Sequence, residues 1–338
     1  MTHSPPLGLT MGDPAGIGPE ILMKSVVDLA GRTPLVALGH VDVFKEHAQK
    51  LGLDISIRSI GSIEEWRHPD KGQSKPELQV VQTGSLDHVP ALGKVAAACG
   101  QAAFDAVVSG ITLAKAGKIS GIVTAPLHKE ALSAAGVHFP GHTEMLAHYC
   151  NGCRVAMMLM NNDVKVVLVT IHCSLRSVVD QINIADQVET IRIAHRSLQL
   201  FGFEHPRIAV AGLNPHAGEN GLFGPEEGEV IIPAIKAARN EGIDVSGPFP
   251  GDTVFMQARE GQFDVVVAQY HDQGLIPIKY CGLDEGVNVT LGLPIVRTSP
   301  DHGTAFDIAG RGIARPDSMQ AAINAALTLQ KRTIDHAL

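Results

Sequence analysis

Short apolar runs alternate with longer amphipathic segments along this 338-residue chain. The apolar runs have the length of buried strands and comprise residues 7–10, 34–39, 119–124, 207–212 and 263–268. The segments between them repeat apolar side chains at helical spacing and predict helices at about 21–29, 41–52, 93–118, 184–200, 227–240 and 317–331. This alternation of strand and helix is typical of an α/β fold with a mostly parallel sheet.

One pair of apolar runs departs from this alternation. Residues 155–160 and 164–170 are separated only by Asn161, Asn162 and Asp163. Two apolar runs joined by a short polar turn predict an antiparallel hairpin. A chain of this length exceeds the usual size of a single core, so we expect two domains.

Composition and charge narrow the class of protein. Hydrophobic residues make up 45% of the chain and charged residues 18%, as in globular proteins, and the formal net charge is −8. This acidic balance argues against nucleic acid as the main partner, although a local basic pocket could bind a small anion. No secretory signal and no apolar run of transmembrane length is evident, so we expect a cytoplasmic protein without membrane attachment.

The cysteines favour reduced thiols over a disulfide framework, because they are odd in number and widely spaced. They are Cys99, Cys150, Cys153, Cys173 and Cys281. Cys150 and Cys153 have the CxxC spacing of redox and zinc sites. No second such pair lies nearby to complete a zinc site, and we interpret them as two unrelated thiols at the end of a helix.

His172, His216 and His271 each come a few residues after an apolar run. A single histidine in such a place is more often a hydrogen-bonded loop residue, but strand ends at one edge of a sheet converge in space. Three imidazole ligands with an open position are typical of catalytic metal sites and suit Zn, Co, Ni or Fe(II). Asp252 or Asp272 could add an oxygen ligand or orient a histidine.

Other basic and polar side chains indicate a pocket for an anion. Lys279 and Arg297 suit the capture of a phosphate or carboxylate, and Asn288 lies on a short apolar run between them. Ordinary surface salt bridges would explain the same residues. His142 and Thr143 begin a predicted helix, where Thr143 could cap the helix or the free N–H groups could bind a phosphate.

A glycine-rich loop, residues 11–20, joins the first strand to the first helix. Its glycines would let the backbone approach a ligand closely, or would simply make a tight turn. The loop has neither the GxGxxG of dinucleotide-binding folds nor the Gly-Lys-Ser/Thr of a P-loop.

Five segments together resemble the motifs of the 4-hydroxythreonine-4-phosphate dehydrogenase family of pyridoxal phosphate biosynthesis. They are residues 11–20, 141–144, 214–219, 270–274 and 301–305; they occur in the family's order and span nearly the whole chain. Residues 301–310 are also similar to the adenosine-binding loop of the isocitrate and isopropylmalate dehydrogenases, to which the family is related in fold.

The resemblance implies two α/β/α domains, isocitrate/isopropylmalate dehydrogenase-like, with the active site in the cleft between them. Residues 1–140 plus 290–338 would form a domain that contributes to NAD binding. Residues 141–289 would form a domain that carries the metal ligands and the dimer interface. The family is a homodimer with a shared active site.

The reaction implied by the resemblance is an NAD-dependent oxidation followed by a decarboxylation. The C3 hydroxyl of 4-phosphooxy-L-threonine is oxidised, and the resulting β-keto acid loses carbon dioxide to give 3-amino-2-oxopropyl phosphate. One subgroup of the family instead oxidises D-threonate or D-erythronate 4-phosphate in sugar-acid breakdown, and residues 218–224 are at least as similar to that subgroup. A non-catalytic metabolite-binding protein on the same fold is the alternative from a different class.

The resemblance also implies roles for individual residues. The ligands of a divalent metal (Zn, Mg or Co) match His172, His216 and His271. The substrate contacts match His142, Thr143, Lys279, Asn288 and Arg297. The residues expected to bind the cofactor are Gly12, Asp13, His302, Gly303, Thr304 and Asp307. The group that takes the hydroxyl proton stays open among Asp252, Asp272, Lys279 and a water on the metal.

Overall fold

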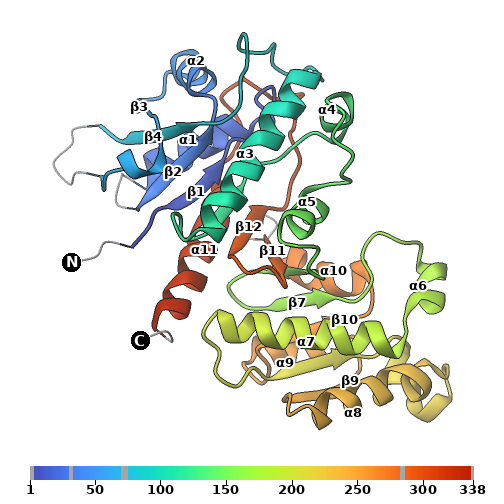
Figure 1. Ribbon diagram of the computed structural model, residues 1–338. Coiled ribbons are helices and arrows are strands. Elements are labelled where there is room, and N and C mark those ends of the chain that lie inside the picture. Colours follow the sequence, from blue (N-terminus) through green and yellow to red (C-terminus); the bar gives the residue numbers. More distant parts are fainter. Residues whose placement is uncertain (1–3, 30–32, 70–74, 282–285, 336–338) are drawn as a thin grey trace. The chain divides into compact units, whose positions relative to one another are not determined.

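The computed structural model describes residues 4–29, 33–69, 75–281 and 286–335, and it divides into two compact units (Figure 1). Unit 1 comprises residues 1–153 and 293–330, and unit 2 comprises residues 154–292 and 331–338. The chain thus changes unit at 153/154 and at 292/293, where the sequence prediction had placed the changes near 140 and 290. Strands and helices occur in both units, and the predicted α/β class is confirmed.

Six strands, all paired in parallel, form the sheet of unit 1. In spatial order they are β3 (Ser56–Ile60), β4 (Glu77–Gln82), β2 (Leu35–Gly39), β1 (Leu7–Thr10), β5 (Ile122–Thr124) and β12 (Arg297–Pro300). Every residue of β1, β2, β5 and β12 is buried. This pattern is expected of a parallel sheet covered by helices on both faces.

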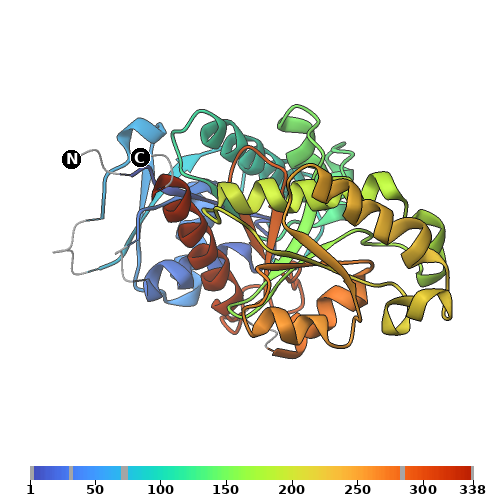
Figure 2. The same cartoon turned by 90° about the horizontal axis from the view of Figure 1, so that it is seen from below.

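Helices cover both faces of the unit 1 sheet. They are α1 (Gly18–Asp28), α2 (Val41–Leu51), α3 (Ala97–Lys115), α4 (Lys129–Ala134), α5 (His142–Tyr149) and α11 (Asp317–Asp335). Figure 2 shows α3 on one face and α11 on the other, and the Thr298 hydroxyl of β12 donates a hydrogen bond to the Ala322 carbonyl of α11. The first strands and helices therefore carry residues 11–20 to one end of this sheet.

One helix is relevant to the expectation that no segment has transmembrane length. Among the described residues, α3 alone is long and apolar enough to cross a membrane, with a mean hydropathy of 1.3 over its most apolar window. In the structure α3 packs against β1, β2 and β5, and half of that window is buried. We therefore interpret α3 as a core helix of unit 1.

The sheet of unit 2 mixes antiparallel and parallel pairs. In spatial order its strands are β11 (Val287–Leu291), β6 (Ala156–Met160), β7 (Lys165–Leu168), β10 (Val265–Ala268), β8 (Ile208–Ala211) and β9 (Val245–Phe249). β6 pairs antiparallel with both β7 and β11, so the predicted hairpin is confirmed. The pairs from β7 through β10 and β8 to β9 are parallel.

The helices of unit 2 also lie on both faces of its sheet. They are α6 (Leu175–Gln181), α7 (Ile184–Leu200), α8 (Ile232–Asn240), α9 (Val254–Arg259) and α10 (His271–Cys281). Both α7 and α10 contact β6 and β7, and Figure 2 shows them on opposite sides of these strands. A 3₁₀ segment (Pro215–Gly221) and a π-helical turn (Glu227–Ile231) lie between β8 and α8.

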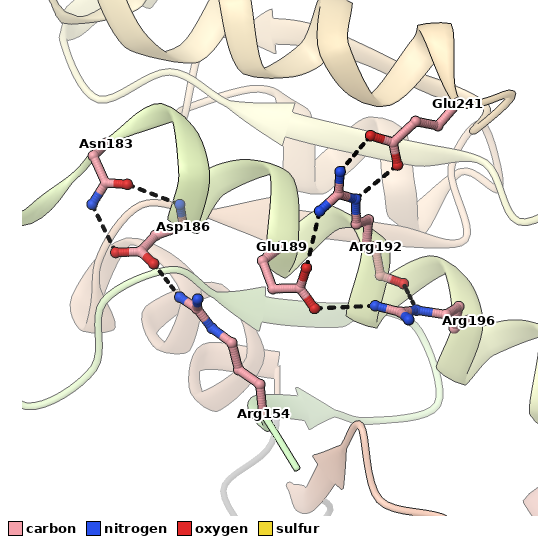
Figure 3. Close-up of polar contacts among 7 residues, drawn as sticks. All are labelled: Arg154, Asn183, Asp186, Glu189, Arg192, Arg196 and Glu241. Atoms are coloured by element: carbon pink, nitrogen blue, oxygen red, sulfur yellow. Dashed lines mark hydrogen bonds and ion pairs between the residues drawn. The ribbon is translucent and has the colours of Figure 1, made fainter.

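Ion pairs connect the exposed face of α7 to its neighbours (Figure 3). Arg192 pairs with Glu189 on the same helix and with Glu241, which follows α8. Arg154, which precedes β6, pairs with Asp186 in the first turn of α7. Exposed pairs of this kind contribute only about 0–1 kcal/mol each, so the buried apolar side chains remain the main source of stability.

Candidate active site

The three histidines expected to bind a metal follow three neighbouring strands of unit 2. β10 lies between β7 and β8 and pairs in parallel with each of them. The carboxyl ends of parallel strands meet at one edge of a sheet, which is where ligands bind in α/β folds. The segments that carry His172, His216 and His271 therefore begin at the same edge.

His172 and His271 lie side by side, with 5.8 Å between their ring centroids. Two imidazoles on one ion have centroids at most about 6.4 Å apart, because each nitrogen lies about 2.1 Å from the metal. Nδ1 of His271 is 2.8 Å from Oδ1 of Asp272, so Nε2 is the ring nitrogen left for a ligand. A carboxylate commonly orients a metal-binding histidine in this way. These donors fit a divalent cation that accepts imidazole.

His216 lies on the rim of a pocket of about 480 Å³ in unit 2. Asp252, Tyr270, Asp272 and Gln273 line the same pocket. In the part of the chain that the structure describes, no three His, Cys, Asp or Glu side chains are close enough together to hold an ion. The assignment of His216 as the third ligand therefore stays a prediction.

The turn that carries His216 has an unusual backbone. His216, Ala217, Gly218, Glu219 and Asn220 all have positive φ angles, between 44° and 80°. Each non-glycine residue in such a conformation costs of the order of 1–3 kcal/mol and persists only where its surroundings enforce it. Strain of this kind clusters at functional sites, which supports a role for the turn.

Glu227 is the residue that holds this turn. Its side chain is buried, and Oε1 accepts hydrogen bonds of 2.7 Å from the backbone N–H groups of both Leu213 and Asn214. Oε2 accepts a third, of 2.9 Å, from the Asn214 side chain. A Cβ on Gly218 would lie 2.5 Å from the same oxygen, so only glycine fits beside this carboxylate.

Two glutamines join the three strand ends. The Gln269 side chain is fully buried and donates to the Ala211 carbonyl at 2.8 Å, while the Gln269 backbone carbonyl accepts from the Thr170 hydroxyl at 2.7 Å. Gln273 donates to the Gly212 carbonyl and accepts from the Gln269 backbone N–H, each at 2.7 Å. This network fixes the segments after β7, β8 and β10 relative to one another.

Two of the predicted anion-binding residues of unit 1, Arg297 and His142, lie close to each other. The Arg297 guanidinium is 3% exposed and donates to the Thr124 hydroxyl at 2.7 Å. Burial lowers the pKa of Arg297 to about 9, at which the side chain is still a cation at neutral pH. His142 begins α5, and burial followed by the charge of Arg297 holds its pKa well below 6.5. Unit 1 thus presents a buried cation next to a neutral imidazole.

The remaining predicted substrate and proton-transfer residues lie in unit 2. Lys279 is in the last turn of α10, and Asn288 is the second residue of β11. Asp252 and Asp272 are exposed at the pocket that His216 borders. The structure therefore brings Asp252, Asp272 and His216 to one pocket and pairs His172 with His271, and Asp272 contacts His271.

The two loops expected to bind the cofactor lie against each other in unit 1. The Ile17 N–H donates to the Thr304 carbonyl at 3.0 Å, and a Cβ on Gly16 would lie 2.9 Å from that oxygen. Gly12 has a φ of 71°, and a Cβ there would lie 2.4 Å from the Pro126 carbonyl oxygen. The backbone of this loop therefore requires its glycines.

The predicted cofactor residues of the second loop divide by exposure. Thr304 is buried against the first loop, whereas His302, Gly303 and Asp307 are exposed. Phe306 stacks on His128, with 4.6 Å between ring centroids and 19° between planes. The exposed edge is the part of this loop that a cofactor could contact.

Asp13 is a buried acid within the first loop. Oδ1 accepts a hydrogen bond of 2.8 Å from the Ala15 N–H, and Oδ2 has no hydrogen-bond partner among the described residues. Burial raises the pKa of Asp13 to about 6, against the opposing effects of the Ala15 N–H and His128. An ionised Asp13 therefore destabilises the fold.

Asp13→Asn is expected to stabilise the protein above pH 6 and to have little effect near pH 4. The pKa of Asp13 is 3.8 in the unfolded chain and about 6 in the folded protein, so the stability of the wild type falls as pH rises from about 4 to 6. The loss amounts to about 3 kcal/mol at 1.36 kcal/mol per unit. Asparagine keeps the acceptor for Ala15 and carries no charge. Thermal melts of both proteins across this range test the prediction, and a pH-independent difference in Tm would contradict it.

The described cysteines show no sign of redox or zinc chemistry. Cys99, Cys150, Cys153 and Cys173 are free, and the side chain of Cys281 lies outside the described residues. Burial raises the pKa of the Cys150 and Cys153 thiols, which makes them poor nucleophiles. None of these four residues is in a disulfide, and the reduced state stays a prediction.

Comparison with known proteins decides the family. Residues 31–326 match the family described as "Pyridoxal phosphate biosynthetic protein PdxA". The chain belongs to this family. The resemblance inferred from the five segments is confirmed.

Relatives in the PdxA family bear two kinds of name. A 4-hydroxythreonine-4-phosphate dehydrogenase of Beijerinckia indica is 56% identical, over 97% of this chain and 96% of its own. A D-threonate 4-phosphate dehydrogenase of Salmonella typhimurium is 46% identical, over 96% of this chain and 98% of its own. A crystal structure of a 4-hydroxythreonine-4-phosphate dehydrogenase from Klebsiella pneumoniae has a TM-score of 0.91 at 44% identity, covering 97% of this chain and 100% of its own.

Several residues of this PdxA family member were missed by sequence reasoning. Glu227, Gln269 and Gln273 form contacts that no local motif indicates. Thr124 carried a weak signal, because it ends a predicted strand just before a polar segment. These residues hold the predicted site residues in place through their hydrogen bonds.

Proposed function

We propose that this chain is an NAD-dependent oxidative decarboxylase that acts on 4-phosphooxy-L-threonine. The observation that carries the proposal is the pairing of His172 with His271, oriented by Asp272, at the edge of the sheet next to a pocket. The 56% identical relative bears the name of this activity. The proposed reaction places the protein in vitamin B6 biosynthesis.

The reaction has two balanced steps. The C3 hydroxyl loses its proton to a base, and the C3–H bond breaks to give a hydride to NAD, which leaves a ketone at C3 and NADH. The β-keto acid then breaks its bond to the carboxylate, releases carbon dioxide and takes up a proton to give 3-amino-2-oxopropyl phosphate.

We assign the metal to His172, His216 and His271, with Zn, Mg or Co as candidates. When bound, the metal would act as a Lewis acid that stabilises negative charge on the reacting oxygen. Asp272 would hold the ring of His271 in one orientation. Asp252, Asp272 and Lys279 are the candidates for accepting the hydroxyl proton, and the first two line the pocket.

The phosphate and the carboxylate of the substrate require cations and hydrogen-bond donors at fixed positions. Arg297, held by Thr124, supplies a buried guanidinium, and neutral His142 can donate one hydrogen bond. Thr143, Lys279 and Asn288 complete the proposed substrate contacts. A guanidinium that needs no reorganisation before binding would orient the substrate for hydride transfer.

NAD is proposed to bind to the paired loops of unit 1, at Gly12, Asp13, His302, Gly303, Thr304 and Asp307. The close backbone contact between these loops supports this assignment, because it leaves His302, Gly303 and Asp307 on an exposed edge. The dehydrogenase names of the relatives support a nicotinamide cofactor, and NAD is the form that the family resemblance implies.

A cytoplasmic homodimer with a shared active site is proposed as the working state. Exposed apolar side chains on α6, Leu175 at 65% and Val179 at 47%, support a second copy packing near the histidines of unit 2. The D-threonate or D-erythronate 4-phosphate reaction is the second candidate, favoured by the name of the 46% identical relative. It would use the same metal and phosphate contacts on a substrate with a hydroxyl in place of the amine.

A side-by-side assay of the three substrates tests the proposal. NADH formation is followed with 4-phosphooxy-L-threonine, D-threonate 4-phosphate and D-erythronate 4-phosphate, and kcat/KM is compared. We expect kcat/KM to be at least roughly a hundredfold higher for 4-phosphooxy-L-threonine than for either sugar acid. A site that hydrogen-bonds the amine leaves one of its polar groups unpaired when a hydroxyl takes the place of the amine. A strong preference for either sugar acid overturns the substrate assignment, and no NADH from any of them favours a binding protein.

The same assay tests the metal. Chelator is expected to abolish NADH formation, and added divalent metal to restore it, since the imidazole ligands bind reversibly. Turnover that is insensitive to chelator after prolonged dialysis would count against a metal at His172, His216 and His271.

A further inference from the structure

Glu20 is a buried carboxylate in the first turn of α1, and it is the last residue of the glycine-rich loop. Its side chain has no exposed surface. Oε1 accepts hydrogen bonds from the Lys24 ammonium at 2.8 Å and from the Ala314 backbone N–H at 3.1 Å. A buried charge of this kind is kept only where it is paired, so these contacts determine the position of the side chain.

Lys24, one helical turn later, uses all of its donors. Its ammonium donates to Glu20 Oε1 at 2.8 Å, to the Gly312 carbonyl at 2.8 Å and to the Ala314 carbonyl at 2.7 Å. An ammonium has three N–H groups, and here each has an acceptor. Together, Glu20 and Lys24 bind the backbone of residues 312–314 to α1; we call this pair the Glu20–Lys24 clasp.

The clasp fixes one end of the loop assigned to the cofactor. Residues 301–316 contain no helix or strand, so the conformation of this segment depends on its contacts with the rest of unit 1. The Ile17 N–H holds it at the Thr304 carbonyl, and the clasp holds it at Gly312 and Ala314. Asp307 lies between these attachments, and His302 lies two residues before the first of them.

His47 is a buried imidazole within electrostatic range of Glu20. His47 on α2 is 2% exposed, and burial lowers its pKa, while the Pro14 carbonyl and Glu20 act in the opposite direction. The imidazole is therefore neutral at neutral pH. Lys24 is thus the cation that balances the Glu20 charge within this cluster.

We propose that Glu20 and Lys24 are positioning residues for NAD, which set the conformation of residues 301–316 without touching the cofactor. The inference rests on the proposed function, which places NAD at this loop. A purely structural clasp would change stability alone. A positioning clasp changes the affinity for NAD and leaves the phosphorylated substrate unaffected.

Lys24→Met tests the inference in the full-length protein. The variant keeps the length of the side chain but loses three charge-assisted hydrogen bonds, and we expect KM for NAD to rise about tenfold. KM for the phosphorylated substrate and kcat are expected to change less than about twofold. Lys24→Arg keeps the charge but not the compact ammonium, so an intermediate KM for NAD is expected.

Lys45→Met is the matched control. Lys45 forms an exposed pair with Asp42 on α2, at 3.7 Å, and makes none of the contacts to residues 312–314. Its KM values should equal those of the wild type. An unchanged KM for NAD in folded Lys24→Met, or an equal rise in both KM values, overturns the inference.

Trypsin provides a readout that does not depend on turnover. Arg311 is exposed within the loop and is followed by Gly312, so cleavage there reports how firmly the loop is held. We expect faster cleavage after Arg311 in Lys24→Met than in the wild type or Lys45→Met, and slower cleavage when NAD is added. Equal rates in all three proteins refute the clasp. If cleavage is faster in Lys24→Met but NAD does not slow it, the Glu20–Lys24 clasp does hold the loop, but the site proposed for the cofactor is wrong.

Discussion

His271→Ala is expected to lower kcat/KM at least about a thousandfold while the protein stays folded. The substitution removes one of the two paired imidazoles and leaves Asp272 without the ring that it orients. Little stability should be lost, because His271 is only partly buried. Initial rates of NADH formation, metal content after dialysis and a thermal melt measure the three quantities separately.

The matched substitutions separate direct ligands from supporting residues. His172→Ala and His216→Ala are expected to behave like His271→Ala, while Asp272→Asn should cost about 10- to 100-fold, as for residues that orient a ligand. His205→Ala is the control, because His205 is exposed on the loop between α7 and β8. Near-normal activity in any one of the three histidine variants would remove that residue from the metal site.

Local sequence patterns predicted much of the fold because many elements are determined locally. The prediction of a helix at 184–200 matches α7, where Asn183 accepts a hydrogen bond from the Asp186 N–H and so caps the first turn. The hairpin of β6 and β7 follows from two apolar runs around a polar turn. In both places the apolar period and the flanking residues agree, so no distant contact is needed to decide the structure.

α10 shows where local patterns fail. Gly274 and Pro277 are weak helix formers, and the sequence prediction stopped at the end of the preceding strand. In the structure a Cβ on Gly274 would lie 2.6 Å from Leu168 and 2.8 Å from Val166. Glycine is therefore present because the helix packs closely on the sheet, and packing outweighs the helix propensity.

The candidate site was predictable in its residues but not in its arrangement. The order of strands along the chain is β7, β8, β10, whereas β10 lies between the other two in the sheet. Only long-range pairing decides this order. The left-handed turn at His216 depends on Glu227, which lies outside the turn, and the residue types of Ala217 and Glu219 argue against such a backbone.

Arg297→Met is expected to raise the stability of the ligand-free protein and to lower kcat/KM by about a hundred- to a thousandfold. Burial lowers the pKa of Arg297 from its usual range to about 9, because the charged guanidinium is unfavourable in the desolvated interior. Replacing such a cation with an apolar side chain of similar length should add of the order of 1–4 kcal/mol to the free energy of unfolding. The same charge is the proposed clamp for the anionic substrate, so the loss of activity should appear mainly in KM.

Thr124→Val and Arg196→Met show whether the two effects have one origin. Thr124→Val removes the hydroxyl that accepts a hydrogen bond from Arg297 at 2.7 Å, and should raise KM by about tenfold without the gain in stability. Arg196 is exposed on α7, and its substitution should change neither quantity. The decisive result is that Arg297→Met raises stability but lowers activity. A buried cation that serves substrate binding destabilises the ligand-free protein, and bound anionic substrate compensates for this. A fall in both stability and activity in Arg297→Met would make Arg297 a structural residue, and unchanged KM would exclude it from the substrate pocket.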